Sequence, residues 1–140
     1  MESYKFRAKV NNPKSNMDGQ WYYFTLQEAF KADPIMCRNL DWSTLGMWTT
    51  LVDKNGKPEY EKDIVEFVYL RGLWRGVVEY DPKRACFVYA KARRIDKKVD
   101  FDPIVIPLCE IERWLTGVSE EVIGDIYSNP DLLTASKEEE

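Results

Sequence analysis

The 140-residue chain contains no histidine, and this absence narrows its chemistry more than any motif does. Without imidazole there is no Ser-His-Asp or Cys-His nucleophile, and no zinc site that needs a histidine ligand. The commonest general acid-base group near neutral pH is missing as well. An enzyme built from this sequence has to rely on carboxylates, lysine, tyrosine or an unassisted cysteine. We therefore favour a non-enzymatic role and expect no cofactor and no metal site.

Cysteine is scarce, and long apolar runs are missing. Cys37, Cys86 and Cys109 are an odd number with no CxxC pair, which is typical of small buried thiols in a reducing compartment. No apolar stretch approaches the ~18–20 residues that span a bilayer. The charged N-terminus has no apolar run after it, so it does not resemble a signal peptide. We expect a cytoplasmic protein of a bacterial host cell with no membrane partner.

The sequence has enough apolar surface for a core, and its charge is unevenly spread. Apolar residues make up 44% and aromatic residues 14%, a content too high for a disordered chain.

The net charge is −4, but residues 71–98 carry nine Lys or Arg against three Asp or Glu, whereas residues 109–140 carry two Lys or Arg against nine Asp or Glu. This asymmetry either marks an interaction surface or means that the two segments lie side by side and neutralise each other.

Alternation of apolar and polar residues predicts a mainly β fold with a minor helical part. We expect short antiparallel strands over residues 4–10, 20–24, 48–52, 60–70, 73–80, 85–94, 104–106 and 122–127. Those from about residue 48 to 94 have the pattern of a small barrel, to which the N- and C-terminal strands are additions. Pro103 and Pro107 bracket the strand over residues 104–106, as is typical of an edge strand. The capping-box pattern from Thr25 to Glu28 predicts a short helix. Helical spacing from Leu108 onwards predicts another.

The sequence Asp53-Lys-Asn-Gly56 predicts a tight turn between two strands. Asn55-Gly56 is the preferred pair for a two-residue hairpin, because both central positions need a positive φ. The same residues do not form a calcium loop, which needs glycine at its sixth position and glutamate at its twelfth. Here Gly56 is fourth and Ile64 is twelfth.

Three motifs in order resemble those of the YopX-like family of phage and prophage proteins. Residues 48–65 read WTTLVDKNGKPEYEKDIV, where the family reads QYTGLKDKNGKEIYEGDIV. Residues 122–133, VIGDIYSNPDLL, are similar to VIGNIYENPELL, and the YKFRA of residues 4–8 is similar to IKFRAWD. Thr50 and Lys62 stand where the family has glycine; if those glycines take a positive φ, then in this chain either Thr50 and Lys62 are strained or the turns are rebuilt. Asp125 replaces an asparagine.

The resemblance implies an accessory protein of unknown function with an SH3-like β-barrel, and it supplies no catalytic residues. We accordingly expect three parts. Residues 1–47 form a strand and short-helix segment that packs on the barrel. Residues 48–133 form the SH3-like barrel with a C-terminal extension, and residues 134–140 form a disordered acidic tail. We read the shared motifs as structural, and a non-enzymatic binding or assembly module is the favoured function.

The strand over residues 85–94 carries the candidate binding site. Alternation places Cys86, Val88, Ala90 and Ala92 inside the barrel and Phe87, Tyr89, Lys91 and Arg93 outside. Interleaved aromatics and cations stack bases and track phosphates in proteins that bind single-stranded nucleic acid. Arg75 and Arg94 extend this face, so single-stranded nucleic acid is an alternative ligand. The other interpretation is a solvated strand whose aromatics pack on a neighbouring segment or subunit.

Two further hypotheses concern self-association and catalysis. The segment Trp21-Tyr-Tyr-Phe24 has aromatic residues on both faces, which favours a homo-oligomer or another protein partner. A carboxylate-dependent enzyme is the second alternative, with Glu61, Asp63 and Glu66 as the candidate acids. Glu61 and Asp63 share one face of a strand, and proximity raises the pKa of one of them.

Overall fold

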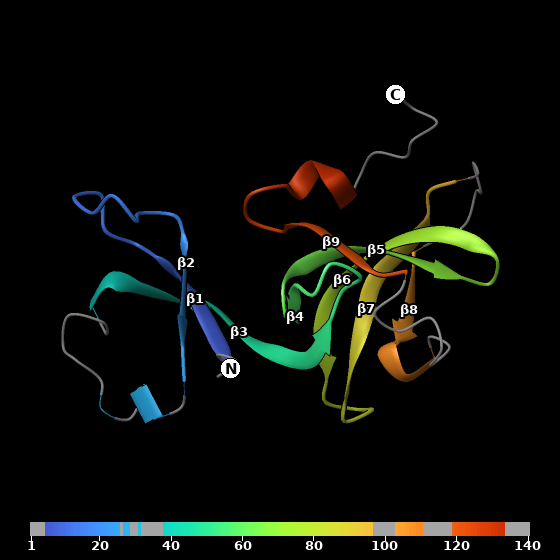
Figure 1. The fold of residues 1–140 in the computed structure, drawn as a ribbon, viewed down its shortest axis with the longest axis horizontal. Helices are drawn as coiled ribbons and strands as arrows, with labels where there is room; N and C mark the ends of the chain where they lie inside the picture. Colours follow the sequence, from blue (N-terminus) through green and yellow to red (C-terminus); the bar gives the residue numbers. More distant parts are fainter. Residues whose placement is uncertain are drawn as a thin grey trace. The chain divides into compact units, whose positions relative to one another are not determined.

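The computed structural model describes residues 5–25, 27–28, 31, 38–96, 103–110 and 119–133. The chain divides into two compact units, Met1–Trp48 and Thr49–Glu140. Figure 1 shows that strands dominate both units. None of the helices among the described residues is long and apolar enough to cross a membrane.

In the first unit, β1 (Phe6–Val10) pairs on one side with β2 (Trp21–Phe24) and on the other with β3 (Leu40–Val52), both antiparallel. One face of this sheet buries a small core, formed by Ala8, Val10, Phe24 and Leu40, with Phe6 and Tyr22 packed against it. The predicted alternation of β1 therefore sets its buried face. The other face holds Trp21, whose ring lies 3.8 Å from the Arg7 guanidinium carbon and 4.5 Å from Lys9 Nζ.

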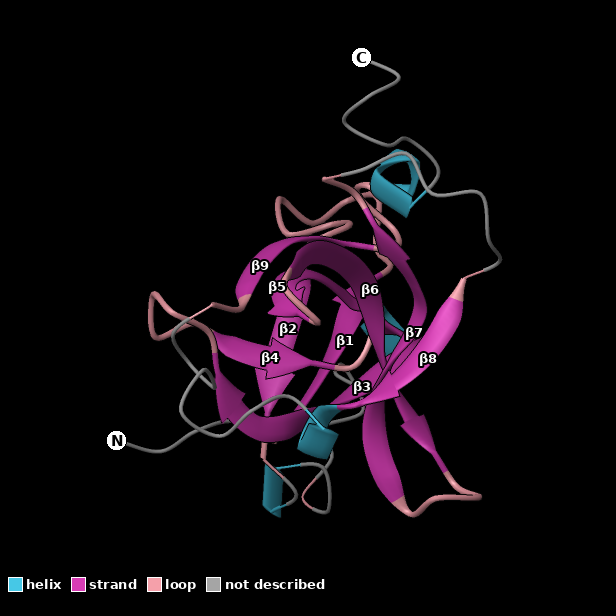
Figure 2. Ribbon diagram, turned by 90° about the vertical axis from the view of Figure 1, so that its right-hand side faces the viewer, coloured by secondary structure: helices cyan, strands magenta, loops and turns pink. Residues whose placement is uncertain are grey.

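The second unit is a curled, five-stranded antiparallel sheet in the order β8-β7-β6-β5-β9. Its strands are β5 (Asp63–Tyr69), β6 (Gly72–Asp81), β7 (Cys86–Arg94), β8 (Ile104–Pro107) and β9 (Glu121–Asp125), and they curve into a half-barrel (Figure 2). The short β4 (Pro58–Tyr60) pairs with β3. Two 3-10 turns, η1 (Leu108–Glu110) and η3 (Pro130–Leu133), follow β8 and β9.

The core of the half-barrel lies on the concave side of this sheet. It consists of Val65, Phe67, Trp74, Val78, Tyr89, Ala92 and Ile106, with Tyr69, Phe87, Leu108 and Val122 packed against them. The aromatic rings of Phe67 and Tyr89 are stacked, with centroids 4.2 Å apart. Burial of these side chains is the main favourable term in folding the unit.

The Asn55-Gly56 turn differs from the prediction in its length. Only Gly56 takes a positive φ, of 79°. Gly56 N donates to Asp53 O, and Asp53 N donates to Lys57 O. The loop is therefore a three-residue hairpin that ends in a left-handed glycine, a common alternative to the two-residue turn.

Both positions where the family motif has glycine do take a positive φ. Thr50 has φ 75° and Lys62 has φ 77°. The turn at Lys62 also explains why the predicted strand over residues 60–70 is divided into β4 and β5. For side chains other than glycine this conformation costs about 1–2 kcal/mol per residue.

Most predicted strands are present, and the mainly β class is confirmed. The SH3-like barrel is not confirmed, since the described strands form a half-barrel with β8 and β9 at its edges. The first part of β3 was not predicted. Glu28 N donates to Thr25 Oγ1 at 3.2 Å, as the capping box predicts, and the Thr25 hydroxyl also donates to Glu28 Oε1 at 3.2 Å. Most of the helix that should follow them, the second predicted helix after residue 110 and the acidic tail lie outside the described residues.

The strain at Lys62 makes a stability prediction. Lys62→Gly should raise the free energy of unfolding by about 0.5–1 kcal/mol, because relief of the left-handed conformation exceeds the extra backbone entropy that glycine loses. Lys57→Gly, in the β3–β4 turn on the other side of β4, is the matched control and should be destabilising, since Lys57 has no positive φ. Urea denaturation of both variants checks this. A loss of stability in Lys62→Gly contradicts the strain argument.

Candidate functional site

The prediction that the aromatic residues of β7 lie on the outer face of the barrel is wrong. Tyr89 is fully buried and Phe87 is half-buried against the core. The cause is a bulge: Lys91 takes φ 52°, and the pairing of β7 with β6 shifts between Arg75 and Val77. One extra residue reverses the alternation, so Tyr89 and Ala92 both point into the core.

The predicted cations are also divided among different contacts. Lys91 and Arg93 are exposed. Arg75 is buried, lies 3.4 Å from the Glu66 carboxylate and donates to the Leu132 carbonyl oxygen at 2.9 Å. Arg94 pairs with Asp96 at 2.8 Å. The aromatics and cations thus do not form one surface, and binding of single-stranded nucleic acid stays a prediction without the stacking platform that motivated it.

The three carboxylates proposed for catalysis do not come together either. Asp63 is buried, and its Oδ2 accepts a hydrogen bond from Tyr60 N at 2.9 Å. Glu66 faces Arg75. Glu61 is only half-buried and is separated from Asp63 by the left-handed Lys62. Asp63 and Glu66 are therefore already engaged in the fold.

A different set of acids gathers inside the second unit. Glu59 in β4 is fully buried, and Glu120, Asp53 and Asp63 are each at most 3% exposed. Tyr89 donates its hydroxyl hydrogen to Glu59 Oε1 at 2.7 Å, whereas Glu59 Oε2 has no hydrogen-bond partner among the described residues. No group of three or more acidic or cysteine side chains in the described part of the chain is placed to hold a metal ion.

The electrostatics of this buried group favour a protonated Glu59. The pKa of Glu59 is raised from 4.5 to about 7, chiefly because the carboxyl group is buried; the hydrogen bond from Tyr89 opposes this rise, and the nearby carboxylates of Glu120, Asp53 and Asp63 add to it. Burial, with Glu59 beside it, also raises the pKa of Tyr89 well above 10. Tyr89 therefore remains a hydrogen-bond donor at all physiological pH values.

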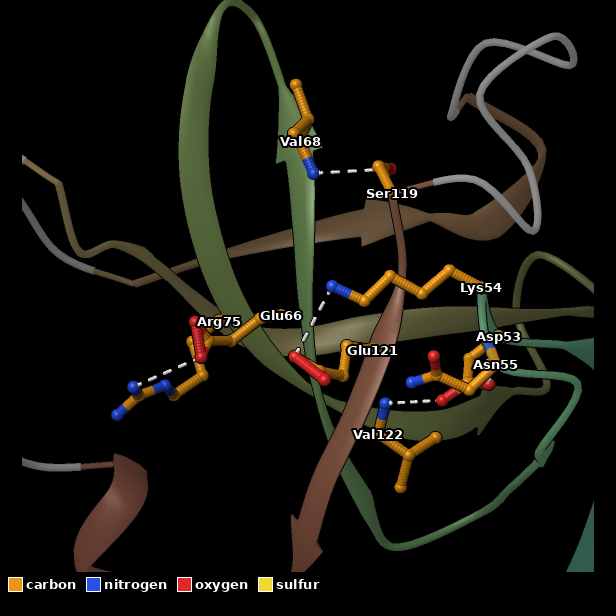
Figure 3. Close-up of polar contacts among 9 residues, drawn as sticks. All are labelled: Asp53, Lys54, Asn55, Glu66, Val68, Arg75, Ser119, Glu121 and Val122. Carbon is orange, nitrogen blue, oxygen red and sulfur yellow. Dashed lines mark hydrogen bonds and ion pairs between the residues drawn. The ribbon is translucent and has the colours of Figure 1, made fainter.

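Asp53 joins two motifs that are far apart in the sequence. Its Oδ1 accepts hydrogen bonds from Asn55 N at 2.9 Å and Lys57 N at 2.8 Å, which close the β3–β4 turn. Its Oδ2 accepts one from Val122 N at 3.0 Å, as Figure 3 shows. A buried carboxylate thus holds the turn and the start of β9 together.

The residues just before and within β9, Ser119–Val122, make three more contacts, and Figure 3 draws those of Ser119 and Glu121. We call them the docking segment. Lys54 N donates to Glu120 O at 2.8 Å, and Lys54 Nζ lies 3.6 Å from Glu121. Val68 N, on β5, donates to Ser119 Oγ at 3.5 Å. The docking segment therefore links the β3–β4 turn to the far end of β5.

The β5–β6 hairpin, lime-green in Figure 1, ends in an unusual turn. Tyr69 pairs with Gly72, so Leu70 and Arg71 are its two central residues, and we call these two the hairpin tip. Their φ angles are 48° and 61°, as a type I′ turn requires. Asn-Gly is the usual pair for such a turn. Leu70 is also 70% exposed.

Sequence reasoning missed Glu59, Glu120 and the hairpin tip for different reasons. The burial of Glu59 could have been suspected from the sequence, because the family motif quoted above has isoleucine, an apolar residue, at this position. Glu120 lies in a segment without alternation, and only the three-dimensional fold brings it to Glu59. Leu70-Arg71 has none of the usual turn residues, so it reads as the end of a strand rather than as a turn.

The bonds of Asp53 predict a large effect of its removal. Asp53→Ala leaves three backbone amides without their acceptor and should lower the free energy of unfolding by about 3 kcal/mol or more. Asp53→Asn keeps one acceptor oxygen and should be less harmful. Urea denaturation compares the two variants. A loss in Asp53→Ala no larger than that of an exposed substitution contradicts the role of this carboxylate.

The raised pKa of Glu59 predicts how stability depends on pH. The unfolded chain releases this proton near pH 4.5 and the folded chain near pH 7. The contribution of Glu59 therefore falls as the pH rises through this interval, by roughly 3 kcal/mol in all. Glu59→Gln should be more stable than the parent protein at about pH 8 and similar to it at about pH 4, as thermal unfolding can measure. Parallel pH profiles for the two proteins contradict the assignment.

Comparison with known proteins agrees with the motifs. The family model described as YopX protein matches residues 2–134. No curated protein matches the chain. The match includes the β3–β4 turn, the buried acids, the hairpin tip and the docking segment. On a match over nearly its whole length, the chain belongs to the YopX family.

Proposed function

We propose that the chain is a non-enzymatic binding or assembly module that contacts a protein partner through the hairpin tip. The observation that carries this proposal is the combination of strain and exposure at Leu70 and Arg71. The resemblance to phage and prophage proteins of unknown function supports an accessory role.

The strain at the hairpin tip has no compensation within the described structure. Each left-handed residue other than glycine costs about 1–2 kcal/mol. Leu70, at 70% exposure, gains little from burial. Arg71 is exposed and makes no ion pair within the described residues. Strained residues of this kind cluster at functional sites, so contact outside the chain is the best account of their presence.

The hairpin holds the tip in a fixed position. Trp74 is buried in the core and donates its indole hydrogen to the Tyr69 carbonyl oxygen at 2.8 Å. The rings of Tyr69 and Trp74 also meet edge to face at 5.8 Å. A rigid element loses little entropy on binding. A leucine beside an arginine suits an apolar pocket with a carboxylate at its rim.

Single-stranded nucleic acid is a second candidate ligand, supported by one observation. Lys91 and Arg93 are exposed on β7 and make no ion pair within the described residues. Two cations can contact phosphates, but the aromatic stacking expected of such a binder is absent from this face because Tyr89 is buried. The hairpin tip therefore carries the first proposal.

Site-specific photo-crosslinking in the host cell tests the role of the hairpin tip. A benzophenone amino acid at position 70 should give a discrete protein adduct. The same amino acid at position 80 is the matched control, because Tyr80 is 42% exposed at the end of a different hairpin. The adduct is then challenged by competition with unlabelled protein, either the parent or the double variant Leu70→Asn with Arg71→Gly. The double variant should be more stable than the parent by about 1–2 kcal/mol, since it has the preferred turn residues.

The proposal expects unlabelled parent protein to suppress the adduct and the double variant to leave it intact. An adduct with a second copy of the chain identifies the module as self-assembling, and an adduct with another protein identifies a heterologous partner. Equal adducts at positions 70 and 80, or equal competition by the double variant, overturn the role of the tip.

A further inference from the structure

Two of the cysteines lie on neighbouring elements at one end of the half-barrel. Cys86 is the first residue of β7, and Cys109 is the middle residue of η1, the turn that directly follows β8. β7 and η1 lie next to each other. Both thiols are free, Cys86 half-buried and Cys109 exposed. The exposure of Cys109 differs from the small buried thiols expected from the sequence, so this residue is open to chemistry.

The pairing of β7 with β8 directs these two positions toward each other. Val88 is the antiparallel partner of Pro107. Each step back along β7 from Val88 therefore corresponds to one step forward from Pro107, and two steps lead to Cys86 on one side and Cys109 on the other. η1 begins at Leu108, so the chain curls here instead of extending the ladder. The two cysteines thus occupy facing positions just beyond the last pair of the ladder.

The residues beside the cysteines point into the core and leave both thiols outside it. Phe87 and Leu108 pack against the core of the half-barrel. Because successive side chains of a strand point to opposite faces, Cys86 faces away from the core side that Phe87 occupies. Cys109, directly after Leu108, is exposed. The two thiols are therefore on the outer side of the same edge of the sheet.

The spacing of facing strand positions suits a disulfide bond. Facing residues of antiparallel strands have Cα atoms about 4.5–5.5 Å apart, within the roughly 4.4–6.8 Å that disulfides span. η1 has only three residues and follows an edge strand of the sheet. A small movement of this turn is enough to set Cys109 opposite Cys86.

We propose that Cys86 and Cys109 are a redox pair that forms a disulfide when the protein meets hydrogen peroxide. The exposed thiol of Cys109 reacts first: its sulfur bonds to one peroxide oxygen, the O–O bond breaks, and a sulfenic acid and one water result. The Cys86 sulfur then displaces the hydroxyl group, which leaves as a second water. Two thiols and one peroxide thus give one disulfide and two waters, with both sulfurs oxidised and the peroxide reduced.

The disulfide fixes an edge of the sheet that is otherwise held by a short ladder. β8 has four residues, and its register with β7 shifts within the strand. A bridge from Cys86 to Cys109 encloses β8 in a covalent loop, which also restricts the unfolded chain. In the reducing cytoplasm expected for this protein such a bridge is transient, as in redox-sensing proteins. Oxidation locks β8 on β7, and reduction removes the lock.

This inference goes beyond the proposed function and does not depend on it. Cys86 pairs with Asp81 at one end of β6, whereas the hairpin tip adjoins Gly72 at the other end. The redox pair and the tip are therefore separate sites of the second unit. Failure of photo-crosslinking at position 70 leaves the redox pair standing, and failure of the redox pair leaves the tip standing.

Peroxide treatment of the reduced, full-length protein tests the pair. After alkylation of the remaining thiols and digestion without reductant, mass spectrometry should show one peptide pair joined between Cys86 and Cys109, in monomeric protein. Cys37→Ser is the matched control and should form the same bridge. In Cys86→Ser, Cys109 should stop at the sulfenic acid, which dimedone traps. A bridge that requires Cys37, a bridge found only between two copies of the chain, or oxidation of Cys109 beyond the sulfenic acid with no bridge overturns the pair.

Amide hydrogen exchange tests the lock on β8. In the parent protein, exchange of the β8 amides should become about tenfold slower after oxidation, because opening of this edge is restrained. Amides of the β5–β6 hairpin are the internal reference and should not change. Peroxide-treated Cys109→Ser should exchange like the reduced parent. Equal exchange of β8 in the reduced and the bridged parent overturns the lock.

Discussion

The buried carboxylate of Asp53 is the interaction on which the second unit depends. A turn and an edge strand almost seventy positions apart in sequence are joined by the two oxygens of one side chain. The turn closes because Oδ1 accepts two of its amides, and β9 starts in register because Oδ2 accepts Val122 N. The fold can leave its sheet open because this carboxylate, rather than a further strand, satisfies the amide at that edge. The Asp53-Lys-Asn-Gly56 sequence thus has a structural role, because the hydrogen bonds of Asp53 close the turn and fix β9.

Much of the strand order follows from the sequence, because alternation and turn residues act locally. The strands over residues 73–80 and 104–106 and the glycine turn at Gly56 were predicted from such signals. The faces of β7 could not be predicted, since a single left-handed residue, Lys91, reverses the alternation and nothing in its side chain indicates this. The group of buried acids was harder to predict than the faces of β7. Glu59 and Glu120 are separated by sixty positions, and only the closure of β9 on β5 brings them together.

Left-handed residues other than glycine recur along the chain, and they have different consequences. Thr50 and Lys62 occupy places where the family motif has glycine, a residue that adopts this conformation without strain. Lys91 strains a bulge that turns Tyr89 inward toward Glu59. Leu70 and Arg71 form the exposed end of the β5–β6 hairpin. The same backbone conformation thus occurs in connecting turns, in a bulge of the core and at an exposed hairpin tip.

An open sheet has two edges, and each of them invites another chain to add a strand. In β8, four residues long, Ile104 and Val105 are exposed, but proline flanks the strand at position 103 and ends it at position 107. Neither proline has an amide hydrogen to offer, so an incoming strand finds a very short row of donors. At the other edge, on β9, Val122 N already donates its hydrogen bond to Asp53 Oδ2. Both edges of the described sheet therefore offer few free backbone donors with which another chain could extend it.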